Sequence, residues 1–461
     1  MKNWTAMPTI FTGGNAGIRA LVERTSWKIT AHNRWWSANT DYAKQNGGAY
    51  DFFVDTAAEG VMAVPLEQRF WADLLTQSVT DWGLTTYEQD WLYNELQGVE
   101  ALLTDATLGR QWLLQMGAGA EAAGVSIQLC MAYPRHTLQT LEMPTATQIR
   151  ASDDHVPGRA GGASPVQWKL GFSSLLAWSV GLAPFKDNLW STAQQPGSSC
   201  GANATEVTPS LHNAASVFSA GPVTPGDGVG MSDVAQILRA CTASGRLLQP
   251  SRPMTALDVR IVAGAFPGAP GTPTGEVQAT YSDVGGVLFD HLLAAELTAP
   301  FSVSPADLAA IRADRALRLS AAQAAAAAAA AAAAPTAVAY ALNADTLDPA
   351  SLVVAAFDAA HPIALAPCNL ADFALWHTAP VFAANGWALL GELGKYVPVA
   401  EARFADIAAD SGALSVAVAG SAGEVVPVTF YNSATASTVT VRCVLPASGS
   451  ATAAVPAATC A

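Results

Sequence analysis

Positive charge is scarce in this 461-residue sequence, which contains 23 Lys and Arg against 37 Asp and Glu and has a formal net charge of −14. Nucleic acids and anionic membrane surfaces are bound through basic patches, and the sequence shows none, so we expect neither as a partner. Charged residues make up only 13% of the chain and hydrophobic residues 51%, which argues against a largely disordered acidic protein.

The sequence signatures of metal, redox and membrane proteins are missing as well. The six cysteines form no CxxC pair, which indicates neither a zinc site nor a dense disulfide framework and leaves the cellular compartment open. His136, His155 and His212 do not have the spacing of metal ligands, so we expect no metal and no cofactor. Outside one alanine tract, the sequence has no run of about 18 or more apolar residues, which is the length needed to span a membrane.

The alanine tract separates two parts of the sequence with different patterns. Residues 321–334 are Ala except for Gln323, and Pro335 ends the tract, which predicts a helical or partly ordered spacer. After it, short runs rich in β-branched residues alternate with Gly, Pro, Asn and Asp, as in an antiparallel β domain. Before it, short apolar runs alternate with stretches of helical spacing, which predicts an α/β fold with a parallel sheet.

The first part contains no GxGxxG motif or phosphate loop after an early strand, which favours a barrel over an open nucleotide-binding sheet. We therefore predict a (β/α) barrel over residues 1–260, a barrel extension with the alanine spacer over 261–335, and a β-sandwich over 336–461.

Acidic residues end two of the predicted barrel strands, where the catalytic residues of barrels lie. Asp90 ends the run that begins at Thr85, and Asp153 and Asp154 follow the run that begins at Thr147. Paired carboxylates in such positions suit the cleavage of a glycosidic bond. Asp at a strand end also commonly caps a helix or forms a turn, and the spacing alone does not decide between these roles.

Polar residues mixed with Trp form two further clusters, at residues 32–36 and 186–190. Either cluster can line a sugar pocket, with Trp offering a flat apolar ring face and Asn or Arg binding hydroxyl groups, and we list Trp36, Trp91 and Asp187 as candidates to contact the sugar. The alternative for the Trp residues is a place in the core. A GxSxG pattern at residues 197–201 has no apolar strand before it, so we interpret it as a flexible loop and not as a nucleophile elbow.

Several of these segments, taken in order, resemble the raffinose synthase and alkaline α-galactosidase family of glycoside hydrolase clan D, which is family 36-like. The matching segments are Arg150-Ala151-Ser152-Asp153-Asp154, residues 211–216 and 221–223, residues 226–230, residues 247–250 with 252–253, and residues 363–367. The resemblance implies a retaining glycosidase or galactosyltransferase with a barrel core. It makes Asp90 the nucleophile and Asp154 the acid/base, with Asp153 as a rival, and it places Cys130, Trp36 and Arg150 near the sugar.

Two features depart from the family pattern. Related enzymes carry a Lys two residues before the nucleophile, where this chain has Glu88. The family also has an N-terminal β domain and a barrel strand ahead of the position of Asn3, so we expect a (β/α)8-type barrel that lacks its first strand. The sequence thus predicts a hydrolase or transglycosylase acting on α-galactosides, or else an impaired relative that binds carbohydrate without turnover.

Overall fold

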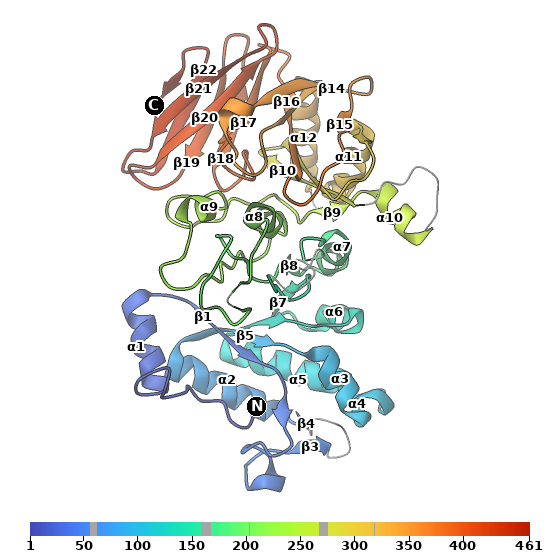
Figure 1. Ribbon diagram of the computed structural model, residues 1–461, viewed down its shortest axis with the longest axis vertical. Helices are drawn as coiled ribbons and strands as arrows, with labels where there is room; N and C mark the ends of the chain where they lie inside the picture. The colour runs from blue at the N-terminus through green and yellow to red at the C-terminus, as the bar shows by residue number, and fades with distance from the viewer. Residues whose placement is uncertain (56–61, 158–166, 202, 267–274, 318) are drawn as a thin grey trace. The chain divides into compact units, whose positions relative to one another are not determined.

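The computed structural model describes residues 1–55, 62–157, 167–201, 203–266, 275–317 and 319–461 (Figure 1). The chain divides into two compact units. The N-terminal unit comprises Met1–Arg150 and Leu176–Pro184, and the C-terminal unit comprises Ala151–Leu175 and Phe185–Ala461. This division lies well before the boundary that we predicted at residue 260.

A five-stranded sheet, whose neighbouring strands pair in parallel from the first strand to the fourth, forms the centre of the N-terminal unit. Its strands, in spatial order, are β1 (Ile29–Asn33), β5 (Leu84–Gln89), β6 (Ser126–Leu129), β7 (Ala146–Arg150) and β8 (Ala183–Phe185). The spatial order follows the chain order, so every crossover proceeds in one direction, as in a barrel. A doubly wound sheet would instead reverse direction at a switch point.

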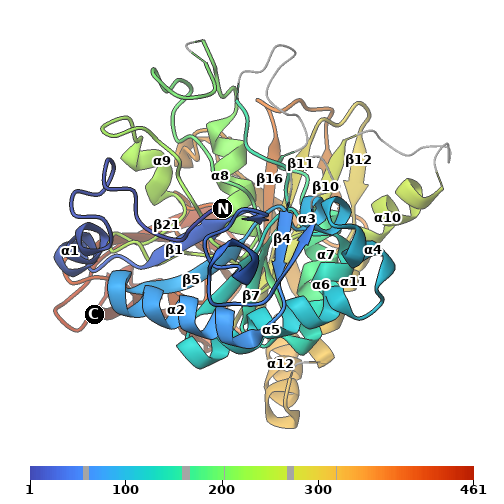
Figure 2. The ribbon, with the colours of Figure 1, turned by 90° about the horizontal axis from the view of Figure 1, so that it is seen from below.

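Two long helices, α2 (Gln68–Trp82) and α5 (Leu108–Ala123), cover one face of this sheet (Figures 1 and 2). The buried side of α2 repeats at helical spacing, and Gly83 ends the helix in the left-handed conformation with φ 78°. Gly119 of α5 lets the helices approach closely, since a Cβ atom there would lie 2.4 Å from the Cβ of Trp71. The other helices and the small antiparallel sheet of this part of the chain are α1 (Asn15–Thr25), α3 (Leu92–Gly98), α4 (Glu100–Thr104), α6 (Pro134–Gln139), α7 (Gly171–Ser179), β2 (Trp36–Ser37), β3 (Phe52–Asp55) and β4 (Met62–Pro65).

The C-terminal unit is built mainly of antiparallel strands. One sheet has the order β21 (Ser437–Val444), β20 (Val425–Asn432), β17 (Trp387–Gly391), β16 (Ala374–Val381), β11 (Val287–Ala295), β10 (Glu276–Val284) and β9 (Thr255–Ala256), with β13 (Thr336–Ala341) on β16 and β14 (Val353–Phe357) on β13. A second sheet has the order β18 (Phe404–Ala409), β19 (Leu414–Ala419), β22 (Ser450–Val455) and β23 (Thr459–Cys460), and β12 (Phe301–Val303) pairs with β15 (Ile363–Leu365). A parallel sheet followed by an antiparallel β domain is the predicted fold class.

The segment that we expected to extend the barrel belongs to the antiparallel domain instead. Within it, β10 and β11 form a hairpin, and His291 to Ala294 of β11 pair with Ala374 to His377 of β16. The alanine tract is a helix, α12 (Ala321–Ala333), whose N-terminus is closed by reciprocal hydrogen bonds between Ser320 and Gln323. It connects strands of one unit and does not mark a boundary between units.

A disulfide joins Cys443 of β21 to Cys460 of β23, with 5.3 Å between the Cα atoms. These strands belong to different sheets, so the bond links the two antiparallel layers of the C-terminal unit. The remaining helices of this unit are α8 (Pro209–Phe218), α9 (Val234–Leu238), α10 (Asp258–Ala265) and α11 (Pro305–Ile311). Across the described ranges, no helix has both the length and the apolar character needed to cross a bilayer.

Candidate active site

The face of the parallel sheet opposite helices α2 and α5 carries a row of polar side chains. Tyr87 of β5 is fully buried and packs on Trp71 of α2, with 5.7 Å between ring centroids. Because successive side chains alternate between the two faces of a strand, Thr86, Glu88 and the following Asp90 point away from these helices. We call this the polar face of the sheet.

Neighbouring strands continue the polar face in register. The hydroxyl oxygens of Thr86 and Ser126 lie 2.9 Å apart, and Glu88 is hydrogen-bonded to Gln128 of β6. On the other side of β5, His32 of β1 is the register partner of Glu88. Parallel pairing therefore places one polar residue of each neighbouring strand at the same level.

Asp90 lies at the carboxyl end of β5, where three donors meet its side chain. His32 Nε2 is 2.9 Å from Asp90 Oδ2, the backbone N–H of Trp91 donates to Oδ1 over 2.7 Å, and the thiol of Cys130 donates a further hydrogen bond. The backbone fixes this end of the strands, since the Asp90 N–H donates to the Asn33 carbonyl over 2.8 Å. The Asp90 side chain retains 11% exposure, so it is sheltered without being sealed.

These contacts hold Asp90 in its ionised form. Burial by itself would raise the pKa of Asp90, but the hydrogen bonds from His32, Cys130 and the Trp91 N–H outweigh burial and lower it. The same contact with Asp90 raises the pKa of His32, against the opposing effect of burial. An ionised carboxylate at a strand end has the protonation state that a nucleophile requires.

Glu88, two residues earlier on the same face, has the opposite tendency. Burial raises its pKa, and the negative charge of Asp90 adds to the effect despite the opposing influence of His32. Two carboxyl groups on one strand thus have pKa values shifted in opposite directions, a pattern that accompanies a division of roles between a proton donor and a charged carboxylate. From the sequence, we had treated Glu88 only as a departure from the family pattern.

Aromatic and basic side chains lie beside Asp90. The ring of Trp91 lies 5.0 Å from that of Trp35, and the guanidinium carbon of Arg34 is 4.9 Å from the centre of a Trp91 ring. Trp91 adopts the left-handed conformation with φ 56°, which is uncommon for a bulky residue and is found at functional sites more often than elsewhere. Both indoles are half-buried, so they have surface available for a ligand.

Trp36, which we expected near the sugar, lies in the core of the N-terminal unit. Its side chain is 1% exposed, and its ring contacts Tyr42, Phe70 and Trp71 at centroid distances of 5.4, 5.1 and 6.5 Å. With its ring surrounded by other aromatic rings, Trp36 has no face left for a ligand, which corrects the expected contact. The sequence does not reveal this difference, because Trp35 lies in the link before strand β2 whereas Trp36 begins that strand.

The other candidate residues are divided between the two units. Cys130 directly follows strand β6 and Arg150 ends strand β7, both in the N-terminal unit, and the Cys130 thiol bonds to Asp90 as described. Asp153 and Asp154 belong to the C-terminal unit, and both are exposed. Asp187 of the same unit accepts a 2.6 Å hydrogen bond from the His155 N–H. The pairing of Asp90 with Asp153 or Asp154 therefore stays a prediction.

The structure brings together two histidines that we had set aside as metal ligands. His155 and His212 both lie against the carboxylate of Glu206, and all three residues are buried. The third histidine, His136, lies in the N-terminal unit, where its Nδ1 accepts a hydrogen bond from the Tyr133 N–H at the start of α6. The sequence gives no signal for this cluster, because Glu206 is 51 residues from His155 and belongs to no recognisable motif.

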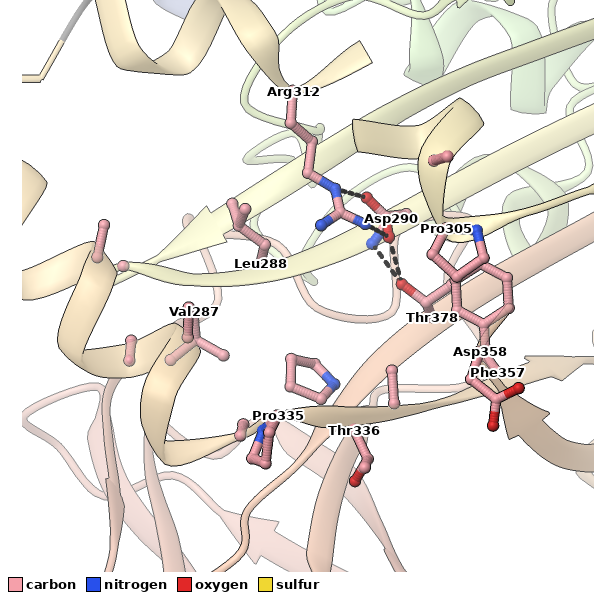
Figure 3. Close-up of a pocket in the computed structure, with 18 of the residues that line it drawn as sticks. Val287, Leu288, Asp290, Pro305, Arg312, Pro335, Thr336, Phe357, Asp358 and Thr378 are labelled. Carbon is pink, nitrogen blue, oxygen red and sulfur yellow. Dashed lines mark hydrogen bonds and ion pairs between the residues drawn. The ribbon is translucent and has the colours of Figure 1, made fainter. Parts of the chain in front are cut away.

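A cavity of about 630 Å³ lies in the antiparallel domain, beside helix α12 (Figure 3). Its main polar group is Asp290, whose two oxygens each accept a 2.6 Å hydrogen bond from Arg312, while Oδ2 also accepts one from the Thr378 hydroxyl. The carboxylate is thus engaged by protein donors, and most of the remaining wall is apolar. Its lining contains no Trp and no His, whereas Asp90 lies beside Trp91 and His32.

Comparisons with known proteins give a likeness of fold. No family model matches the sequence, and no curated protein is similar to it in sequence. The structure is similar to a GH27 β-L-arabinopyranosidase from Geobacillus stearothermophilus, with a TM-score of 0.52 and 12% identity over 82% of this chain and 79% of that one. This likeness shows a barrel-type fold followed by a β domain, as predicted.

Weaker likenesses are found to two further structures. An α-amylase from Malbranchea cinnamomea gives a TM-score of 0.38 at 10% identity, covering 78% of this chain and 77% of that one. AmyP in complex with maltose gives 0.34 at 11% identity, with the same coverage of both chains. We base the fold assignment on the arabinopyranosidase alone.

The different environments of Trp36 and Trp91 give a testable prediction. Trp36→Ala should lower the free energy of unfolding of the N-terminal unit by about 3–5 kcal/mol, because it empties a packed aromatic core. Trp91→Ala, the matched control, should cost about 1 kcal/mol or less, because its ring is partly exposed. Urea unfolding followed by circular dichroism measures both, and equal losses would contradict the assignment of Trp36 to the core and Trp91 to the site.

Proposed function

We propose that this protein is a retaining glycosidase acting on α-galactosides, with Asp90 as its nucleophile. The observation that carries the proposal is the position of Asp90, which is ionised at the carboxyl end of β5 and held by His32, Cys130 and the Trp91 N–H. A nucleophile needs a charged and oriented carboxylate, and the lowered pKa of Asp90 and its three hydrogen bonds support that role. Either water or a second sugar can accept the glycosyl group.

In the first step, an Asp90 oxygen attacks the anomeric carbon while the bond from that carbon to the leaving oxygen breaks. The leaving oxygen takes a proton from a carboxylic acid, for which Asp154 and its rival Asp153 are the candidates. In the second step, water attacks the glycosyl-enzyme and gives its proton to that same carboxylate, which restores the acid and frees Asp90. The two inversions together retain the anomeric configuration.

The surroundings of Asp90 suit a sugar substrate. Trp91 and Trp35 provide half-buried apolar surface for a ring face, and Arg34 provides donors for hydroxyl oxygens. Glu88 stands where the resembling family has a Lys, so this position offers a carboxyl group in place of an ammonium donor to the sugar hydroxyls. We therefore test which sugars the protein accepts. A substrate panel should contain α-D-galactosides and β-L-arabinopyranosides, because these sugars differ only by the C6 hydroxymethyl group.

Replacing the nucleophile tests the proposal. Asp90→Asn should reduce hydrolysis of an aryl α-galactoside by roughly 10³-fold or more, because no carboxylate is left to attack. Asp51→Asn, which removes an exposed partner of Lys44, should leave the rate unchanged. In Asp90→Gly, added azide should restore turnover and yield the β-galactosyl azide, because the small anion attacks from the face opposite the leaving group.

Two results would contradict this proposal. Unchanged turnover by Asp90→Asn would remove Asp90 from the mechanism. Saturable binding of oligosaccharides by the unaltered protein, with no turnover of any glycoside in the panel, would establish the alternative of a carbohydrate-binding protein.

A leaving-group comparison identifies the acid/base. Replacing the true acid by Ala should slow substrates with poor leaving groups, such as raffinose, far more than aryl glycosides with good ones, because only poor leaving groups need the proton. Asp153→Ala and Asp154→Ala serve as controls for each other, since both residues are exposed neighbours. If neither variant changes the ratio of the two rates, the acid lies elsewhere, and Glu88→Gln is the next variant to measure.

A further inference from the structure

We propose that His155, Glu206 and His212 of the C-terminal unit form a binding site for a divalent transition-metal ion, and that Zn²⁺ is the ion that this set of donors fits best. The site uses none of the residues assigned above to glycoside cleavage, although His155 directly follows Asp154 in the chain, and the proposal does not depend on that function. Two imidazoles and one carboxylate are a ligand set that zinc proteins use when a fourth position is left to water or substrate.

The three donor groups are close enough to share one ion. One ligand atom from each residue lies within 4.8 Å of the others. His155 Nε2 is 2.8 Å from Glu206 Oε2, and His212 Nε2 is 3.4 Å from Glu206 Oε1. Bonds of about 2.0–2.1 Å to zinc place neighbouring ligand atoms roughly 3.3 Å apart in a tetrahedron, so a small widening of the first distance suffices.

A second group orients His155 for this role. Its Nδ1 lies 2.8 Å from the amide oxygen of Asn188, and with the amide assigned in that direction Nδ1 carries the proton and donates it. Nε2 then presents a lone pair toward the Glu206 carboxylate. Histidines that bind metals are commonly held in this way by an oxygen acceptor on the other ring nitrogen. A lone pair and a carboxylate 2.8 Å apart repel unless a cation or a proton lies between them.

Because the three side chains are buried, a cation that lies between them must be either a metal ion or a proton. The side chains of His155, Glu206 and His212 are 1%, 0% and 3% exposed, so water does not screen them. A proton would satisfy only the contact between His155 and Glu206. It would leave His212 Nε2 with only a long contact of 3.4 Å to Glu206. A metal ion would engage both histidines together.

A buried lysine acts against the site and limits its affinity. Lys186 is fully buried, its charge acts on His212, and its ammonium donates to the backbone carbonyls of Asp187 and Asn188 over 3.3 and 2.7 Å. The negative charge of Glu206 acts on His212 in the opposite sense to the charge of Lys186. Nearby charge therefore does not forbid a cation.

An adjoining cavity provides room for a fourth ligand. It has a volume of about 360 Å³, and its wall includes His155, Asn188, Asp227 and residues 195–200. That stretch contains most of the GxSxG segment, which we had interpreted as a flexible loop, and the buried Ser198 hydroxyl has no partner in the described structure. A metal ion bound to His155 would therefore lie next to a polar cavity able to hold water or a small polar ligand.

Metal analysis of the full chain tests the proposal. The protein is stripped with a chelator and dialysed, and Zn²⁺ is added in a calorimetric titration, with bound zinc counted by mass spectrometry. We expect about one ion per chain, a melting temperature that rises with Zn²⁺, and binding at least tenfold weaker in His212→Gln and Glu206→Gln. His136→Gln, which alters a buried histidine of the other unit, should leave the affinity unchanged.

Two further measurements test the metal site without replacing any of its three ligands, so they remain valid if the ligand variants do not fold. Asn188→Ala removes only the group that orients His155 and should weaken binding by roughly 10- to 100-fold. Co²⁺ in the unaltered protein should give the spectrum of nitrogen and oxygen ligation, and a thiolate charge-transfer band would place the ion at a cysteine and overturn the proposal. Absence of binding, with a melting temperature indifferent to metal and chelator, would show that a proton holds the cluster together.

Discussion

The register of strands β1, β5 and β6 is the constraint on which the candidate site depends. Tyr87 fixes it from one side, because its ring packs on Trp71, its hydroxyl donates to Gln89 over 2.9 Å, and it accepts from Asn33 over 2.7 Å. With Tyr87 and Gln89 held on the helix side, Glu88 and Asp90 can point only to the opposite face. A shift by one residue would exchange the two sets and bury the carboxylates under the helices.

The polar face then sets the charge states of its own carboxyl groups. Asp90 directly follows the strand, where the Trp91 N–H, His32 and Cys130 donate hydrogen bonds to it, and its pKa is lowered. Glu88 lies two residues earlier, within strand β5, where burial is the largest effect and raises its pKa. Two carboxyl groups separated by one residue thereby have pKa values shifted in opposite directions.

The sequence predicts those features of the molecule that depend on local pattern. The strand expected over residues 85–90 is β5 at Leu84–Gln89, and the alanine tract forms a helix because Ala strongly favours one. The sequence analysis assigned strands β10 and β11 to an extension of the barrel, because they follow the α/β part of the sequence directly. Their place in the antiparallel domain depends on pairing with the distant strand β16. The core position of Trp36, the cluster around Glu206 and the Cys443 to Cys460 bond all depend on contacts between distant segments, which periodicity does not report.

The most direct test of the account is to trap the glycosyl-enzyme. The protein is incubated with a 2-deoxy-2-fluoro-α-galactosyl fluoride or a matching cyclitol epoxide, digested, and mapped by tandem mass spectrometry. We expect one modified peptide with the sugar on Asp90, and we expect excess galactose to suppress the labelling. A label on Glu88, Asp153, Asp154 or Asp187 in place of Asp90 would contradict it.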